Sequence, residues 1–386
     1  CNTPMEVIGK KVVREELRII PAKVERIQYV QEVLGCPECK KDGASVIVGA
    51  ETPSPLLKHS LASPSTVAYV MYQKYVKILR ATLANWVIRC GMDYMGPVYE
   101  QLRHHLLERD IIHADETPCQ VLKENGKTAQ SKSYIWLYGS GNDGLPPIRL
   151  YDYQPSRGGY HAEEFLKGFS GYLTCDGFGG YNKLKDVIRC GCLAHMRRYW
   201  HDALPGESKK TPDKTPAEIG FDYCNQLFEL EKEYVDLDAE TRKTKRLETE
   251  PPIWKAYWSW LETVNPVGGS RLAKAVTYAK NQKPYMENYL LDGRCSISNN
   301  IAENIARPYA VGRKNFLFHD TVKGAQASSI IYSLAETAKL NNLNIYAYLE
   351  TVLLYMPDYK DEPEGIEELM PWSEMIQQRC RIKSKS

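Results

Sequence analysis

The order of short apolar runs between residues 110 and 203 constrains the fold more than any other feature of this sequence. Three runs typical of strands come first, at 111–117, 133–138 and 148–153. Asn142-Asp143-Gly144, between the second and third runs, is a hairpin signal. The runs that follow are a helical one at 161–169, two that suit strands at 171–175 and 187–190, and a helical one at 193–203. Hairpins followed by β-α-β segments predict an α/β fold, with a mixed sheet flanked by helices.

Prolines and helical periodicity divide the rest of the chain. Residues 51–65 carry three prolines and several serines, which is typical of a linker, and residues 215–290 have helical spacing. Within the helical segment, Pro251-Pro252 ends a polar stretch at 240–250. The acidic, proline-broken segment 357–369 is expected to be a solvated tail. Four segments are predicted. They are a small N-terminal module (1–50), a linker with a helical region (51–108), an α/β domain (109–340) with a helical insertion at about 205–290, and a C-terminal helix and tail (341–386).

Composition excludes some classes of protein but does not select one. Hydrophobic residues make up 43% and charged residues 25% of the 386 residues, which are ordinary globular values. The net charge of +2 neither indicates nor excludes a nucleic-acid-binding protein. No apolar run reaches the ~18 residues that span a bilayer, so we expect a soluble cytoplasmic protein with no membrane partner. The 11 cysteines are scattered and odd in number, which favours reduced thiols over disulfides.

Three acidic residues stand in surroundings typical of reactive groups. Asp115 lies in a predicted strand, and because side chains alternate along a strand, its neighbour Glu116 is expected to point to the opposite face and to stay out of the same site. Asp176 follows the predicted strand 171–175. Glu303 comes shortly after Asn299-Asn300, a pair that can cap a helix and place Glu303 in its first turn.

Two strand carboxylates and one helix carboxylate would form a set of hard oxygen ligands that favours Mg²⁺ or Mn²⁺. Two such ions can activate a nucleophile and stabilise a leaving oxygen, which is the chemistry of phosphodiester cleavage and transfer. The chain has 48 acidic residues, however, so spacing alone leaves surface or helix-capping roles open for these three.

Four long segments give the sequence a resemblance to a known family. HADETPCQVL, YLTCDGFGGYNKL, CLAHMRRYWHDA and DGRCSISNNIAENIARPYAVGRKNFLF resemble, in this order, bacterial transposases of the insertion sequence 66 family. The resemblance implies a ribonuclease-H-like catalytic domain of the DDE class, with Asp115, Asp176 and Glu303 as the catalytic triad and as ligands of Mg²⁺ or Mn²⁺. It also implies that the partner is DNA, namely the terminal inverted repeats and the target. Accessory proteins of the same element, a homo-oligomer on DNA and a nucleoid-associated location are implied as well.

The same resemblance extends to the N-terminus and includes departures. Residues after Cys1 resemble the segment that follows a CxxC pair in the family, so Cys1, Cys36 and Cys39 are expected as zinc ligands of a truncated zinc-finger-like module. The run 72–82 is shorter than in relatives, and Asn304 replaces the arginine usual after the glutamate. Two alternatives to a transposase therefore stay open: a truncated DNA-binding remnant without transposition activity, and a metal-dependent nuclease of the same fold.

Basic residues near the acidic segments are candidates for DNA contact. We expect phosphate contacts from a set close to the second and third acidic segments, namely Arg197, Arg198, Arg307, Arg313 and Lys314. Ordinary surface charge is the alternative for each. Cys192-x-x-His195 is weaker as a metal site, because a lone CxxH pattern is more often structural, with a buried thiol and a hydrogen-bonded imidazole.

Overall fold

The computed structural model describes residues 33–35, 47–49, 80–206, 213–359 and 363–382. The chain divides into two compact units, Cys1–Ile78 and Leu79–Ser386. In the first unit, the described residues form an antiparallel pair of short strands, β1 (Val33–Gly35) and β2 (Ile47–Gly49). The expected zinc ligands Cys1, Cys36 and Cys39 lie outside the described residues.

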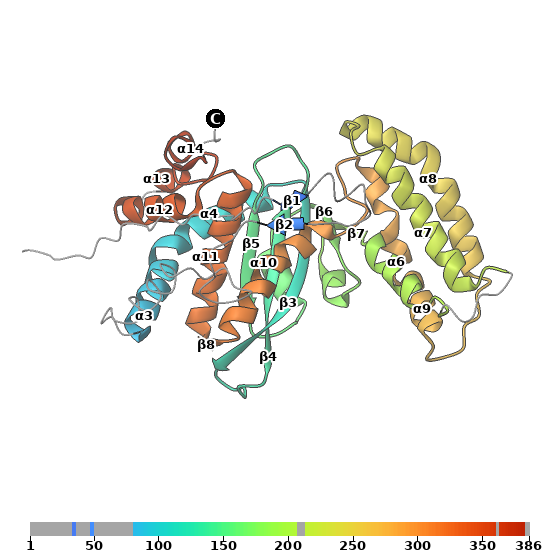
Figure 1. Ribbon diagram of the computed structural model, residues 1–386, viewed down its shortest axis with the longest axis horizontal. Helices are drawn as coiled ribbons and strands as arrows, with labels where there is room; N and C mark the ends of the chain where they lie inside the picture. Colours follow the sequence, from blue (N-terminus) through green and yellow to red (C-terminus); the bar gives the residue numbers. More distant parts are fainter. Residues whose placement is uncertain (1–32, 36–46, 50–79, 207–212, 360–362, 383–386) are drawn as a thin grey trace, which may run out of the picture. The chain divides into compact units, whose positions relative to one another are not determined.

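A mixed sheet forms the centre of the second unit (Figure 1). Its strands are β3 (Ile111–Lys123), β4 (Lys132–Ser140), β5 (Arg149–Gln154), β6 (Gly171–Cys175) and β7 (Val187–Gly191). They lie in the order β5-β4-β3-β6-β7, with β3, β4 and β5 antiparallel in succession and β6 and β7 parallel to β3. This order and these directions are those of a ribonuclease-H-like sheet, so the predicted fold class is confirmed.

Strand β3 is longer than its apolar run suggests. It continues through Pro118 to Lys123, where β8 (His319–Thr321) pairs with it. Pairing between β3 and β6 stops at His113, and pairing with β8 begins at Val121. Pro118 is tolerated because β3 has only β4 as a neighbour at that point, as on an edge strand.

Helices cover both faces of the sheet. They are α3 (Arg80–Cys90), the π-helical turn η1 (Gly91–Met95), α4 (Gly96–Leu107), α5 (Tyr160–Phe165), the 3₁₀ turn η2 (Gly179–Lys183), α6 (Leu193–Asp202), α10 (Asn300–Phe316) and α11 (Val322–Leu340). Trp136 and Tyr138 of β4 belong to the buried cluster that includes residues of α4 and α5. Ile135 and Leu137 face the other way, toward α10. None of the described helices is long and apolar enough to cross a membrane.

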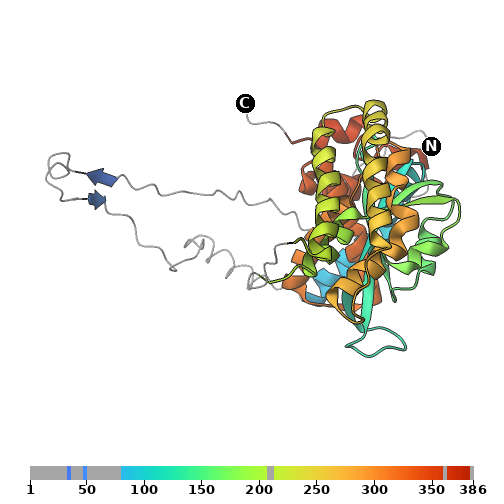
Figure 2. The same cartoon turned by 90° about the vertical axis from the view of Figure 1, so that its right-hand side faces the viewer.

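A helical block follows α6, made of α7 (Pro216–Glu233), α8 (Ala239–Leu261), α9 (Arg271–Met286) and the 3₁₀ turn η4 (Asn288–Leu291). Figures 1 and 2 show α7, α8 and α9 lying alongside one another. Helix α8 runs through Pro251 and Pro252, which end the polar stretch but not the helix. Burial of Trp254 and Tyr257 in the next turns holds the helix together past the prolines.

Hydroxyl groups of α11 complete the outer edge of the sheet. Tyr151 of β5 donates its backbone N–H to Ser333 Oγ at 2.8 Å. Arg149 donates its N–H to Thr337 Oγ1 at 3.0 Å, and that hydroxyl donates back to the Arg149 carbonyl at 2.9 Å. Ser333 and Thr337 are four residues apart and therefore lie on one face of α11. The helix thus supplies the hydrogen bonds that a further strand would otherwise make.

The C-terminal segment packs on α4 through α12 (Ile345–Tyr359), α13 (Pro363–Glu367) and α14 (Glu374–Cys380). The expectation of a solvated tail over 357–369 is wrong for the described part, because Leu369 is fully buried. Glu367 accepts a hydrogen bond from Gln101 of α4 at 2.8 Å. The acidic composition of this segment gave no indication that the short helix α13 forms here.

Candidate functional site

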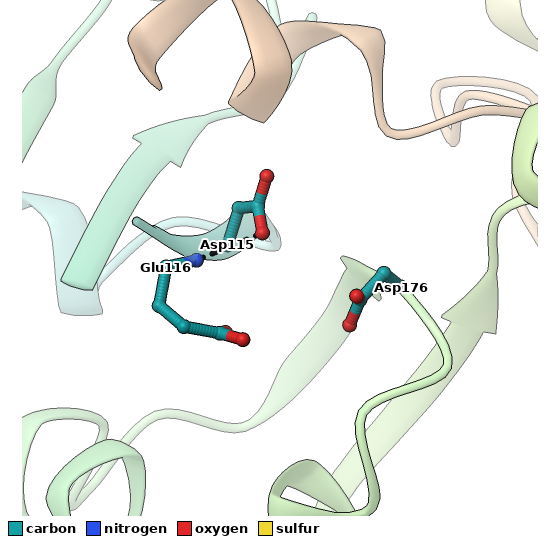
Figure 3. A group of neighbouring side chains, drawn as sticks. All are labelled: Asp115, Glu116 and Asp176. Atoms are coloured by element: carbon teal, nitrogen blue, oxygen red, sulfur yellow. Dashed lines mark hydrogen bonds between the residues drawn. The ribbon is translucent and has the colours of Figure 1, made fainter. Parts of the chain in front are cut away.

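Two of the candidate acidic residues meet where the parallel pairing between β3 and β6 ends. His113 of β3 is paired with Thr174 of β6, so Asp115 and Asp176, each two residues further on, lie on the same face of the sheet. Asp115 offers an oxygen to a three-carboxylate group with Asp176 and Glu116, whose ligand atoms all lie within 4.8 Å of one another (Figure 3).

The presence of Glu116 in this group overturns the expectation that its side chain stays out of the site. Figure 3 shows Asp115 and Glu116 leaving β3 in opposite directions, with Asp176 across a gap from both. The gap exists because pairing between β3 and β6 stops at His113 and Thr174. Between His113 and Val121 no strand flanks β3 on this side, so carboxylates from both of its faces can reach the same space.

Glu116 is already neutralised by its neighbours. Arg157 donates from Nε to Glu116 Oε1 at 2.6 Å, and Tyr181 donates its hydroxyl to Oε2 at 2.9 Å. The Glu116 side chain is 1% exposed, whereas Arg157 is 45% exposed and lies over the Phe178 ring. Burial and then the charge of Asp176 raise the pKa of Glu116, and Arg157 opposes that shift.

Asp115 carries the strongest sign of crowded negative charge. Burial, followed by the charge of Glu116, raises its pKa to about 7, and Asp176 and Glu303 add to the effect. One hydrogen bond, from the Glu116 backbone N–H to Asp115 Oδ1 at 2.8 Å, opposes it. Asp176 Oδ1 accepts from the backbone N–H of Phe178 at 2.9 Å. A set of oxygen donors that repel one another fits a hard divalent cation such as Mg²⁺ or Mn²⁺.

Glu303 lies in the first turn of α10 but outside the three-carboxylate group. Its Oε1 accepts from Arg198 Nη2 at 3.2 Å and lies 4.0 Å from His195 Nε2. Its charge still raises the pKa of Asp115, which shows that the two carboxylates are within electrostatic reach. The structure therefore brings Asp115 and Asp176 together and places Glu303 beside them in an ion pair.

Asn299 sets where α10 begins relative to β3. Its side chain does not cap the helix, contrary to the expectation for the asparagine pair. Instead, its Nδ2 donates to the Ala114 carbonyl at 2.8 Å, and its Oδ1 lies 3.0 Å from Nδ1 of His113. Its backbone N–H donates to Cys192 Sγ at 3.2 Å, which gives that thiol a structural contact. Because Asn299 is fully buried, these bonds fix the start of the helix that carries Glu303.

The basic candidates for DNA contact are in different situations. Arg197 donates from Nε to Asn225 Oδ1 at 2.6 Å and lies over the Phe221 ring, so it is packed into the helical block. Arg198 is paired with Glu303, and Arg313 donates to the Pro118 carbonyl. Arg307 and Lys314 are exposed on α10. Their roles in binding DNA stay predictions.

Sequence reasoning missed Glu116, Arg157 and the side-chain role of Asn299. Alternation along a strand argued against Glu116, and nothing local marks Arg157 as its partner. A polar His113 within a buried apolar strand was the available signal for a buried partner such as Asn299. The eight cysteines in the described part of the chain are free thiols, in line with the expected reduced state.

Comparison with known families gives matches along most of the chain. The model of the family described as "Transposase IS66 family" matches residues 59–327. The "IS66 C-terminal element" matches residues 333–372, and the "zinc-finger binding domain of transposase IS66" matches residues 1–40.

Similar curated proteins come from Sinorhizobium fredii (strain NBRC 101917 / NGR234). The uncharacterized protein y4qI is 28% identical over 398 residues, covering 93% of this chain and 70% of its own length. The uncharacterized protein y4jD is 25% identical, covering 97% of this chain and 77% of its own length. Among solved structures, the Drosophila P element transposase strand transfer complex covers 79% of this chain and 90% of its own, at 13% identity and a TM-score of 0.23. A score this low supports no structural argument.

Proposed function

The chain belongs to the IS66 family of transposases, and from that premise we propose that it cuts DNA at the ends of an insertion sequence and joins the freed ends to target DNA. In this proposal Asp115, Asp176 and Glu303 are the catalytic residues and hold two divalent ions, Mg²⁺ or Mn²⁺. The observation that carries it is the convergence of Asp115 and Asp176 just beyond the point where the parallel pairing of β3 and β6 ends.

The reaction has two in-line displacements at phosphorus. A water molecule attacks the phosphodiester at the transposon end, and the departing oxygen becomes a free 3′-hydroxyl. That hydroxyl then attacks a phosphodiester of the target, and the target strand leaves with its own 3′-hydroxyl. Divalent ions, when bound, would supply activation of the nucleophile and stabilisation of the leaving oxygen.

The residues of the chain have separate tasks in these steps. Asp115 and Asp176 are held by hydrogen bonds from the backbone N–H groups of Glu116 and Phe178, which fixes their oxygens before DNA arrives. Glu303 would join them as a third ligand once freed from its bond to Arg198. Arg198 would then be available to a DNA phosphate, as are the exposed Arg307 and Lys314 of α10.

Replacing Asp176 by Asn tests the assignment, with Asp186→Asn as the matched control. Asp186 is exposed and its φ is 60°, a left-handed conformation that asparagine also adopts readily. We expect Asp176→Asn to abolish Mn²⁺-dependent strand transfer between a transposon-end oligonucleotide and plasmid DNA, and Asp186→Asn to leave it unchanged. Strand transfer by Asp176→Asn at the wild-type rate would falsify the assignment.

The same assay separates the alternatives. Cleaved ends that are never joined would favour a metal-dependent nuclease. Binding of terminal repeats with no cleavage in Mg²⁺ or Mn²⁺ would favour a DNA-binding remnant. Joining that occurs only after proteins of the same element are added would support the proposed accessory partners, and analytical ultracentrifugation on paired end DNA would report the proposed homo-oligomer.

Zinc in the N-terminal module is a separate proposal, with Cys1, Cys36 and Cys39 as thiolate ligands. The match of the zinc-finger domain model to residues 1–40 supports it. Zinc released by acid from the purified chain should fall in Cys36→Ser and Cys39→Ser but not in Cys90→Ser, whose thiol lies in α3. Equal zinc content in all of these proteins would contradict the assignment.

A further inference from the structure

Arg189 is a buried cation that hydrogen-bonds the backbone of Asp176. It lies on β7, paired in register with Leu173 of β6, and is 5% exposed. Its Nη2 donates to the Asp176 carbonyl at 2.5 Å, and its Nε donates to Cys175 Sγ at 3.1 Å. A further nitrogen, Nη1, donates to Asn182 Oδ1. The guanidinium therefore holds the end of β6 and the turn that follows it.

The contacts of Arg189 differ from those of Arg246, another buried arginine of this unit. Arg246 is 1% exposed and donates to both oxygens of Glu231 at 2.7 Å, which is a usual way to bury this side chain. No ion pair within the described residues involves Arg189, and its acceptors are a thiol, a carbonyl and amide oxygens. A buried cation without a paired carboxylate is costly. Its hydrogen bond to the Asp176 carbonyl indicates that its role is to hold the loop that follows β6.

Helix α9 of the helical block completes the surroundings of Arg189. Gln282 Oε1 accepts from Nη2 at 3.0 Å, and the Tyr285 ring lies 4.3 Å from the guanidinium carbon. Tyr278 packs against Gly177, where an added Cβ would come within 2.6 Å of the tyrosine ring. One face of α9 thus covers the Asp176–Gly177 turn, about 100 residues earlier in the sequence.

We propose that Arg189 is a positioning residue for Asp176 that ties this carboxylate to α9, so that the helical block helps to set the affinity of the site for divalent metal. The inference rests on the proposed function and deepens it. Arg189 bonds the backbone of Asp176, while the Phe178 N–H orients the carboxylate. Loosening the backbone anchor lets the carboxylate move, and a metal site tolerates little movement of its ligands.

Mn²⁺ binding to the purified full-length chain, measured by electron paramagnetic resonance of free Mn²⁺ without DNA, tests the inference. Arg189→Lys keeps the charge but loses the planar fork, and should weaken Mn²⁺ affinity on the order of 10-fold, as outer-sphere changes do. Gln282→Leu removes only the bond from α9 and should weaken Mn²⁺ affinity less. Lys280→Ala, also on α9 but paired with Glu262 at the surface, is the matched control and should bind as wild type.

Combining Arg189→Lys with Asp176→Asn distinguishes positioning from general destabilisation. If Arg189 acts through Asp176, adding Arg189→Lys to Asp176→Asn should not weaken Mn²⁺ binding further. Should Arg189→Lys fail to fold, as judged by circular dichroism, Gln282→Leu carries the test. Wild-type Mn²⁺ affinity in the folded Arg189 or Gln282 variant, with Asp176→Asn impaired, would overturn this inference and leave the proposed function intact. Wild-type Mn²⁺ binding and strand transfer by Asp176→Asn itself would instead overturn the proposed function.

Discussion

Arg198 of α6 and Glu303 of α10 form an ion pair, with Nη2 and Oε1 3.2 Å apart, beside Asp115 and Asp176. The two side chains are 56% and 38% exposed, so water screens the attraction and such a pair contributes only ~0–1 kcal/mol. An interaction this weak can be exchanged for contact with a cation on one side and a phosphate on the other. If Glu303 is a metal ligand, as proposed above, Arg198 would compete with divalent metal for it when DNA is absent.

Replacing Arg198 by Ala should tighten Mn²⁺ binding to the DNA-free protein roughly two- to fivefold, because Glu303 loses a competing partner worth up to ~1 kcal/mol. Binding of terminal-repeat DNA should weaken in the same variant. Titration calorimetry with Mn²⁺ and fluorescence anisotropy with labelled DNA measure the two effects. Arg271→Ala, an exposed arginine on α9, is the control. An unchanged Mn²⁺ affinity in Arg198→Ala would show that Glu303 is not available to metal.

Substitutions of Glu116 and Glu303 by Gln should have unequal effects on cleavage. Glu116 is bound by Arg157 and Tyr181, so Glu116→Gln should reduce the cleavage rate by about 10- to 100-fold, as an outer-sphere change. Glu303→Gln should reduce it beyond the ~100-fold upper end of such changes. Single-turnover cleavage of a labelled transposon end at saturating Mn²⁺ compares them. The reverse ranking would assign the third carboxylate to Glu116.

Local rules predicted the parts of this site that depend on local sequence. The limits of β6 follow from an apolar run that ends at Asp176-Gly177. The turn between β4 and β5 follows from Asn142-Asp143-Gly144, where Gly144 has a φ of 80°. Both features depend on a few adjacent residues, so the sequence contains what is needed to predict them.

The remaining features depend on how distant elements meet. Glu116 reaches the site because the β3–β6 ladder stops at His113, and no residue near Glu116 specifies that point. The pairing of Arg198 with Glu303 requires α6 and α10 to lie side by side, although the chain between them forms the helical block. Burial of Trp254 likewise outweighed the local rule that two prolines end a helix. Tertiary packing decided each of these outcomes.

Removing the Ser333 hydroxyl should destabilise the second unit by ~1–3 kcal/mol, because the Tyr151 N–H would stay buried without an acceptor. Urea denaturation followed by tryptophan fluorescence should show a lower midpoint for Ser333→Ala. Ser328→Ala, on the same helix but partly exposed, is the control and should stay within ~0.5 kcal/mol of wild type. Equal midpoints for the two variants would mean that water replaces the hydroxyl.

His319 should make the fold sensitive to acid between pH 6.5 and 4. Burial lowers its pKa from 6.5 to about 4, and its Nε2 lies 2.8 Å from the Tyr309 hydroxyl. The unfolded chain therefore binds more protons than the folded chain in this window. Stability is fully present above pH 6.5 and falls, by up to ~3 kcal/mol, as the pH drops toward 4.

The variant His319→Gln keeps a polar group near Tyr309 but does not titrate, so the loss of stability between pH 6.5 and 4 should become smaller. Some dependence should persist, because burial also lowers the pKa of His113 to about 4. Urea midpoints at several pH values measure the slope of stability against pH. His201→Gln, at an exposed position of α6, should leave the slope unchanged. A slope in His319→Gln equal to that of wild type would rule out this histidine as the cause.

The way α11 closes the outer edge of β5 also bears on self-association. An unprotected strand edge is a template for pairing with another chain and a common origin of aggregation. At Arg149 and Tyr151 that template is occupied by side chains of the same molecule. In the proposed homo-oligomer on DNA, copies of this protein would therefore have to recognise one another through surfaces other than this stretch of β5.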